Sequence, residues 1–166
     1  LEKKINETTI DIIFNCAGVF GGNFEEQEVK NIDFKKFQKV LMVNSISILN
    51  IIKIILNTKK NKNKLELIIN ISSDAGSINQ NKDGNAYIYR TSKSALNSIT
   101  KNLSIDLNKK FGTTVFAIDP GNTKSAMNPG GYIETDNCAK LIIDLITTNP
   151  ELNGKFVNLL GKEILW

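Results

Sequence analysis

The stretch TIDIIFNCAG, residues 9–18, joins a run of β-branched residues to a turn of small residues. Such an apolar run is typical of a strand buried on both faces, and the glycine that follows it predicts a tight turn. LELIINISS at 65–73 predicts a second buried strand, and TTVFAIDPG at 113–121 predicts a third that ends at Pro-Gly. The intervals between these strands are long enough to hold a helix each.

Helical periodicity fills those intervals. Apolar residues recur at threes and fours from about 33 to 58, which predicts a long helix. The sequence also predicts a helix from about 85 to 110, another near 136–147 and a last strand at 155–160. Alternating strands and helices imply right-handed crossovers and a doubly wound α/β fold with a parallel sheet, in a single domain over residues 1–166. Ligands of such sheets bind at the carboxyl ends of the strands.

The charge of the chain is scattered. The net charge is +4, but Arg90 is the sole arginine, and the densest basic stretch, at 58–64, has no interleaved aromatic residues. This stretch reads as a solvated loop, and we expect no nucleic-acid partner. The longest apolar stretch, residues 40–56, is interrupted by polar residues such as Asn44 and Lys53. It falls short of the roughly 20 apolar residues of a membrane span, so we expect a soluble protein with no membrane partner.

The chain contains two cysteines, Cys16 and Cys138, and no histidine. The cysteines are far apart in the sequence, so their spacing predicts neither a zinc site nor a disulfide framework. We expect both thiols to be buried as small apolar side chains, in a reducing, cytoplasmic compartment.

The stretch YRTSK places Tyr89 and Lys93 one turn apart on the predicted helix at 85–110. Residues at i and i+4 project from the same face, and a nearby ammonium favours the phenolate. The spacing therefore predicts a lowered pKa for Tyr89 and a role as general acid/base. Taken alone, so short a pattern more often marks an ordinary half-buried pair. Ser72 and Ser73 end the strand before this helix, where a hydroxyl is placed to hold a substrate oxygen beside Tyr89.

Five motifs in order resemble those of the short-chain dehydrogenase/reductase family. NCAG at 15–18 is similar to the family's NNAG turn, and VN at 43–44 to its catalytic helix asparagine. ISSDAGSI carries its serine, YRTSK its YxxxK pair, and DPGNTKSAM its proline-glycine cofactor loop. The ending NGKFVNLLGKEILW and the run YRTSKSALN most resemble the C-factor-like carbonyl reductase branch. The resemblance implies a Rossmann-like fold, of which this chain carries the C-terminal portion, the fourth to seventh strands.

The resemblance implies an NAD(P)-dependent oxidoreductase of small-molecule carbonyl or alcohol substrates, with NAD or NADP as cofactor and NADP preferred. Tyr89 would exchange a proton with the substrate oxygen, and Lys93 would lower the tyrosine pKa and bind the nicotinamide ribose. Ser73 would orient the substrate; Ser72 is disfavoured because strand alternation points it the other way. Asn44 would anchor a water that links Lys93 to solvent. The alternative for Asn44 is a buried polar side chain satisfied by the backbone.

The resemblance also implies a set of cofactor-binding residues at the strand ends. They are Asn15, Ala17, Gly18, Tyr89, Lys93, Pro120, Gly121 and Ser125. Small residues at a strand end let a cofactor approach the backbone closely. Without the resemblance, Pro120 and Gly121 read as a simple turn. We expect no metal site.

The chain departs from the family pattern in two places. Cys16 replaces the second asparagine of NNAG, and no TGxxxGxG turn of the kind that holds the cofactor pyrophosphate is found in the sequence. We therefore expect the chain to be the catalytic half of a longer polypeptide, since its first strand would otherwise leave an apolar edge exposed.

Two further interpretations stay open. The competing one is a non-catalytic interaction module that keeps these residues but binds no dinucleotide. A sugar-nucleotide epimerase shares YxxxK but is disfavoured by the short C-terminal region. For the enzyme and for the non-catalytic module alike, the resemblance implies a homodimer through the helices near 33–58 and 85–110.

Overall fold

The computed structural model describes residue 5, residues 9–58 and residues 65–166. Residues 59–64 of the expected basic loop lie outside this described part. The sheet has four parallel strands in the order β1-β2-β3-β4, so strands adjacent in sequence are adjacent in space. The strands are β1 (Ile12–Asn15), β2 (Leu67–Ile71), β3 (Thr114–Asp119) and β4 (Phe156–Asn158). The predicted parallel α/β fold is confirmed.

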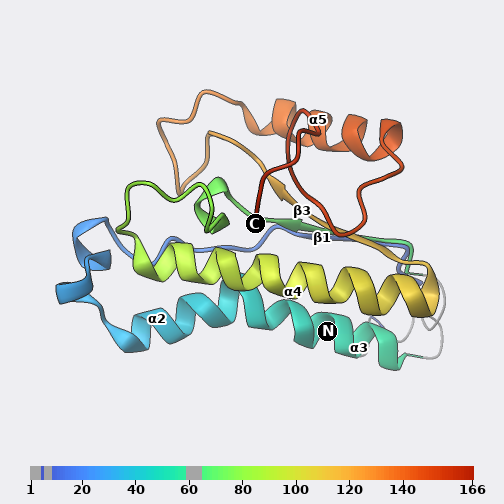
Figure 1. Ribbon diagram of the computed structural model, residues 1–166, viewed down its shortest axis with the longest axis horizontal. Coiled ribbons are helices and arrows are strands. Elements are labelled where there is room, and N and C mark those ends of the chain that lie inside the picture. The colour runs from blue at the N-terminus through green and yellow to red at the C-terminus, as the bar shows by residue number, and fades with distance from the viewer. Residues whose placement is uncertain (1–4, 6–8, 59–64) are drawn as a thin grey trace.

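Helices cover both faces of the sheet (Figure 1). Along one face lie α2, α3 and α4, and on the other lies α5. The helices are α2 (Phe34–Leu41), α3 (Ser47–Asn57), α4 (Tyr87–Phe111) and α5 (Thr135–Thr148), with short 3-10 turns η1 (Glu25–Gln27), η2 (Val29–Asn31) and η4 (Asp74–Gly76). Each helix predicted from periodicity is present within two or three residues of its expected bounds.

The core forms two layers, one on each side of the sheet. Along β2, Ile68 and Ile69 are both fully buried but face opposite sides, as strand alternation requires. Ile68 packs in a cluster with Ile52 of α3 and Leu96 of α4. Ile69 packs in a second cluster with Ile142 of α5. This division explains why the central strands read as uninterrupted apolar runs.

The first strand differs from the prediction of burial on both faces. Ile13 of β1 is buried, but Ile12 is 46% exposed and Phe14 is 41% exposed. The cluster around α5 takes its strand residues from β2, β3 and β4. One face of β1, the edge strand of the described sheet, is therefore left uncovered by α5.

The helix predicted at 33–58 is continuous, but its middle is a π-helical turn, η3 (Met42–Ile46). Asp33 caps its start by accepting hydrogen bonds from the backbone N–H groups of Lys35 and Lys36. Within η3, the Ser45 hydroxyl donates to the carbonyl of Leu41, a bond that competes with the regular helical ladder. Such π turns often occur at functional sites, and this one contains Asn44.

By length and composition, the helix Phe34–Asn57 is long and apolar enough to cross a membrane, with a mean hydropathy of 1.8 in its most apolar window. By length and composition alone, the expectation that this segment is too polar for a membrane span was wrong. The isoleucines around the polar residues raise its mean hydropathy enough. Ile48, Ile52 and Ile55 of the helix are nevertheless buried against the rest of the chain. The buried core helix of a soluble protein passes the same test, so one such helix is weak evidence for a membrane span.

Truncating the centre of the sheet will destabilise the fold. Ile68 has no exposed surface, so Ile68→Ala leaves a cavity between β2, α3 and α4. We expect the free energy of unfolding in urea to fall by about 2–5 kcal/mol. Ile143→Ala is the matched control because Ile143 is 47% exposed on α5. Equal losses in the two variants would contradict the assignment of the core.

Candidate active site

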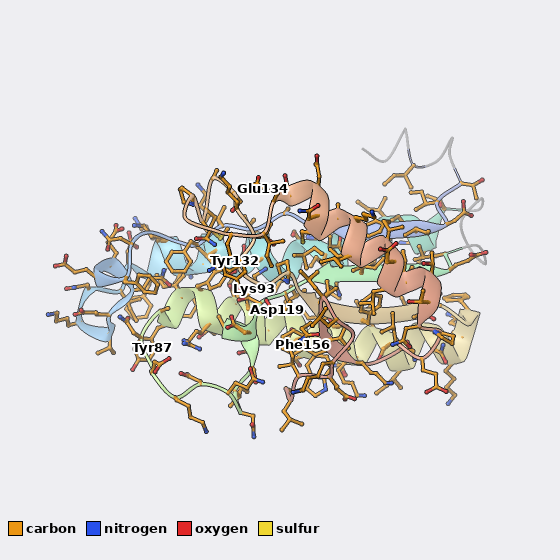
Figure 2. All side chains as sticks on the ribbon, turned by 90° about the horizontal axis from the view of Figure 1, so that it is seen from above. Tyr87, Lys93, Asp119, Tyr132, Glu134 and Phe156 are labelled. Atoms are coloured by element: carbon orange, nitrogen blue, oxygen red, sulfur yellow. The ribbon has the colours of Figure 1, made fainter. Side chains whose placement is uncertain are left out.

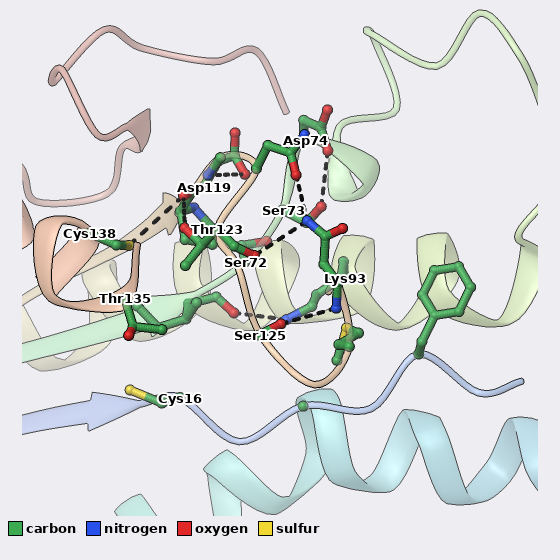
Figure 3. Close-up of a pocket in the computed structure, with 18 of the residues that line it drawn as sticks. Cys16, Ser72, Ser73, Asp74, Lys93, Asp119, Thr123, Ser125, Thr135 and Cys138 are labelled. Atoms are coloured by element: carbon green, nitrogen blue, oxygen red, sulfur yellow. Dashed lines mark hydrogen bonds between the residues drawn. The ribbon is translucent and has the colours of Figure 1, made fainter. Parts of the chain in front are cut away.

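The carboxyl ends of β1, β2 and β3 open onto one pocket of about 970 Å³ (Figure 3). Seven of the predicted site residues line it: Gly18, Ser73, Tyr89, Lys93, Pro120, Gly121 and Ser125. The predicted residues Asn15, Ala17 and Asn44 are not among its lining residues. The pocket lies at the sheet edge where ligands of parallel α/β folds bind.

Lys93 is buried at the base of the pocket. Its side chain is 4% exposed, and Nζ donates a 2.8 Å hydrogen bond to the carbonyl oxygen of Ile71 at the end of β2. Burial lowers the pKa of Lys93 to about 8, and the carboxylate of Asp119 acts in the opposite direction. Figure 2 shows Lys93 and Asp119 close together in projection, in agreement with the charge interaction between them. The pKa of Lys93 therefore lies much closer to neutral pH than the ordinary lysine value of 10.5.

Tyr89 lies on the same face of α4 as Lys93, as its spacing predicted. Lys93 Nζ is 5.7 Å from the centroid of the tyrosine ring. The predicted lowering of the tyrosine pKa is wrong for this structure: burial raises the pKa of Tyr89, while a hydrogen bond with Ser73 lowers it. The reason is geometric, because the ammonium points past the ring to the carbonyl of Ile71. The phenol is thus protonated at neutral pH.

The two serines at the end of β2 have different surroundings. Ser72 is buried and donates a 2.6 Å hydrogen bond to Oδ1 of Asn97 on α4. Ser73 is partly exposed; its hydroxyl donates to Asp74 and accepts from the backbone N–H of Ala75. Ser73 is the serine that also contacts Tyr89. This is the difference that strand alternation leads one to expect.

Asn44 is fully buried behind the loop that follows β1. Its Oδ1 accepts from the backbone N–H of Val19 at 2.8 Å, and its Nδ2 donates to the carbonyl of Val19 and to the hydroxyl of Ser92. These bonds match the alternative in which Asn44 is satisfied by the backbone. A Cβ built on Gly18 would lie 3.7 Å from both Asn44 Oδ1 and Lys93 Nζ. The side chains of Asn44 and Lys93 therefore both lie next to Gly18.

Asn15 and Cys16 lie at the end of β1 and directly after it. Nδ2 of Asn15 donates a 2.7 Å hydrogen bond to Oδ1 of Asn70, its partner across the sheet, so its side chain is engaged within the sheet. The prediction that both thiols are buried holds for Cys138 and is wrong for Cys16, which is exposed. Cys16 follows the edge strand directly, and both cysteines line the pocket.

Sequence reasoning missed the acidic side of the pocket. Asp119 ends β3, and its Oδ1 accepts a 3.2 Å hydrogen bond from the backbone N–H of Gly121. Burial raises the pKa of Asp119, and the nearby carboxylate of Asp74 raises it further. The available signal was position: both residues stand at the carboxyl end of a predicted strand.

Sequence reasoning also missed an aromatic wall. The ring of Phe20 lies 4.9 Å from that of Tyr89, and the ring of Phe24 lies 5.2 Å from that of Phe20. Phe24 is 64% exposed, and all three rings line the pocket. The signal was the pair of phenylalanines in the loop FGGNF, where burial in a core is not expected. The wall gives one side of the pocket an apolar surface.

Comparison with known proteins places this site in a family. Residues 2–132 match the family model of the short chain dehydrogenases. The chain is 28% identical to C-signal of Myxococcus xanthus over 159 residues, which cover 95% of this chain and 93% of that protein. It is also 28% identical over 163 residues to 1-hydroxy-2-glutathionyl-2-methyl-3-butene dehydrogenase of a Rhodococcus species, covering 95% of this chain and 69% of that one.

Solved structures agree with these relatives. Carbonyl reductase Sniffer of D. melanogaster matches with a TM-score of 0.87 and 28% identity, over 99% of this chain and 73% of that one. An NADPH-bound carbonyl reductase from chicken fatty liver matches with a TM-score of 0.80 and 26% identity, over 99% and 69% of the two chains. With most of its length matched by the family model and its site at the strand ends of a parallel sheet, this chain belongs to the short-chain dehydrogenase family of NAD(P)-dependent oxidoreductases.

Proposed function

We propose that this protein interconverts small-molecule carbonyl compounds and alcohols, with Tyr89 as the general acid/base. The observation that carries the proposal is the meeting of Ser73, Tyr89 and Lys93 at one pocket. Support for the carbonyl class comes from the two carbonyl reductases that the fold matches at 26% and 28% identity.

Each residue has a distinct role in the proposed reduction. When bound, the reduced nicotinamide supplies the hydride that the carbonyl carbon takes up. The Ser73 hydroxyl donates a hydrogen bond to the carbonyl oxygen, and Tyr89 transfers its phenolic proton to that oxygen. A buried, protonated phenol suits an acid in this direction. In this proposal the ammonium of Lys93 turns from the carbonyl of Ile71 toward the phenol oxygen, and it then stabilises the phenolate that the transfer leaves.

The residues present fit the nicotinamide end of a dinucleotide. Gly18 leaves open the space beside Lys93 Nζ that a larger side chain would fill. Lys93 is the donor we assign to the ribose, and Pro120, Gly121 and Ser125 line the same pocket. We assign Asn15 and Ala17 to the support of this backbone rather than to direct contact. We propose NADP over NAD, supported by the NADPH in the chicken carbonyl reductase structure.

A second candidate is a non-catalytic interaction protein. It is favoured by one observation, the match to 93% of the length of C-signal, a protein named for signalling and not for a reaction. The two candidates differ in cofactor binding. Titration of the full-length protein with NADPH, followed by the nicotinamide fluorescence, gives saturable binding for the enzyme and none for the interaction protein.

We further propose a homodimer formed through the two long helices. Met42, Ile46 and Leu49 are exposed along η3 and α3 at a spacing that places them on one face, and Ile105 is 56% exposed on α4. An apolar stripe on adjoining helices suits an isologous interface. A cytoplasmic location is proposed as well, supported by the two free cysteines.

Removing the phenolic oxygen of Tyr89 will stop turnover without preventing cofactor binding. We expect Tyr89→Phe in the full-length protein to lower kcat by roughly 10²–10⁴-fold, because no other group is assigned to transfer the proton. NADPH binding, measured by fluorescence, stays within about threefold of wild type. Tyr87→Phe is the matched control, since Tyr87 is 47% exposed on the same helix. Turnover retained in Tyr89→Phe would remove the proposed acid/base.

The buried ammonium will also make stability depend on pH. Lys93 has a folded pKa of about 8 against an ordinary value of 10.5, so between these values the unfolded chain holds more protons. Stability therefore rises with pH across this window, by roughly 3 kcal/mol in total. We expect urea unfolding to show this rise in wild type and not in Lys93→Met.

Lys109→Met serves as the control for that measurement because Lys109 is exposed on α4. It should keep the full pH dependence of wild type. A Lys93→Met variant that keeps the dependence would show that Lys93 is not the buried titrating group.

A further inference from the structure

The helix that carries Tyr89 begins without a cap of its own. Its N-cap residue is Ala86, whose side chain makes no capping hydrogen bond. Asn85 and Ala86 both have left-handed backbone, with φ of 55° and 47°. Two successive non-glycine residues in this conformation are unusual and persist only where surrounding contacts hold them. The first N–H groups of α4 must therefore find partners outside the helix.

Gln27 supplies one of these partners from another part of the chain. Its Oε1 accepts a 2.9 Å hydrogen bond from the backbone N–H of Tyr89, across 62 residues of sequence. Its Nε2 donates a 3.1 Å hydrogen bond to the carbonyl oxygen of Phe20. Gln27 is fully buried. In Figure 1 the turn η1, which contains Gln27, lies at the same end of the molecule as the start of α4.

The same two segments also touch through their rings. The ring centroids of Phe20 and Tyr89 are 4.9 Å apart. The side-chain amide of Gln27 bonds to the backbone of both residues of this pair. Its oxygen accepts from the N–H of Tyr89, and its nitrogen donates to the carbonyl of Phe20. Backbone bonds and ring contact together join the loop after β1 to the residue that carries the phenol.

We propose that Gln27 is a positioning residue that caps α4 in trans and fixes the ring of Tyr89 in the pocket. The inference rests on the proposed function for its catalytic meaning, while its structural part is independent of turnover. Gln27 acts through Tyr89 and touches neither substrate nor cofactor. It also ties the aromatic wall to the acid/base, so that both move as one unit.

The chemistry of the site accounts for glutamine at this position. The two bonds require an acceptor and a donor on the same side chain, which a primary amide provides. Methionine fills a similar volume but provides neither, so Gln27→Met leaves a buried N–H and a buried carbonyl unsatisfied. Glutamate keeps the acceptor for Tyr89 N–H, but it donates to Phe20 only when its carboxyl is protonated.

The test reads Tyr89 directly in the full-length protein. With ¹³C-labelled tyrosine, the titration of the Tyr89 phenol is followed by NMR. We expect Gln27→Met to lower the pKa of Tyr89 relative to wild type, because the ring loses its fixed burial. Amide exchange at Tyr89 should speed up by about tenfold or more. The control Gln38→Met removes an exposed glutamine and should change neither reading.

Turnover gives a second, separable reading. We expect Gln27→Met to lower kcat by about tenfold or more, with the KM for NADPH within about twofold. Gln27→Glu should approach wild-type kcat and amide protection at acid pH and lose both as the pH rises and its carboxyl ionises. Rescue by the protonated carboxyl is not expected of a residue that merely fills space.

The outcomes separate the two proposals. If wild type has no turnover, the proposed function fails, and the NMR titration and amide exchange still decide the role of Gln27. If Gln27→Met does not fold, Gln27→Glu decides, because its pH-dependent recovery requires the donor to Phe20. A folded Gln27→Met with unchanged titration and exchange at Tyr89, or a Gln27→Glu with no pH-dependent recovery, overturns the assignment.

Discussion

The site depends on the burial of one positive charge. Lys93 is 4% exposed, and its ammonium is stable in the folded chain only if its surroundings replace the water it has lost. The carbonyl of Ile71 does this directly, and Asp119 does it at longer range. Because these groups end β2 and β3, the position of Lys93 fixes α4 against the carboxyl edge of the sheet. The loop after β1 passes close to this ammonium at Gly18, where a Cβ would lie 3.7 Å from Lys93 Nζ.

The helix α4 meets the sheet through polar contacts as well as apolar ones. Asn97 accepts from Ser72 and donates to the carbonyl of Gly76, while Thr100 accepts from Asn70. A buried polar network of this kind is favourable only when its members are satisfied, which restricts how the helix can rotate or slide. Leu96 and Ile68 supply burial energy at the same interface. The apolar contacts hold the helix on the sheet, and the polar contacts set its register.

Much of the fold was accessible from the sequence because it depends on periodicity. Strands β2 and β3 and the helix α4 follow from runs and repeats of apolar residues that any local reading detects. The position of Ser73, Tyr89 and Lys93 at one strand-end pocket was likewise predictable, since it follows from topology. The π turn was not, because Met42–Ile46 continues the ordinary amphipathic pattern of the helix around it.

The features that escaped prediction depend on contacts between distant segments. The pKa of Tyr89 was predicted in the wrong direction because spacing on a helix gives the neighbour and not its burial or where its ammonium points. Gln27 was missed because its partners are a backbone N–H and a carbonyl, which carry no sequence signature. Asp119 was read only as part of a turn, although the charge of its carboxylate raises the pKa of Lys93.

The two thiols differ in exposure, and this difference gives the protein one natural site for chemical labelling. Cys16 is exposed and Cys138 is buried, while both line the pocket. A maleimide dye will therefore attach selectively to Cys16, which lines the pocket, without any engineered residue. Although Cys16 as a residue is exposed, its thiol is partly buried, and this partial burial raises the pKa of the thiol. Labelling will therefore be slower than for a free cysteine at the same pH. Because Cys16 lines the pocket, a bound molecule will slow its labelling. The labelling rate, followed by dye fluorescence, then reports whether the pocket is occupied.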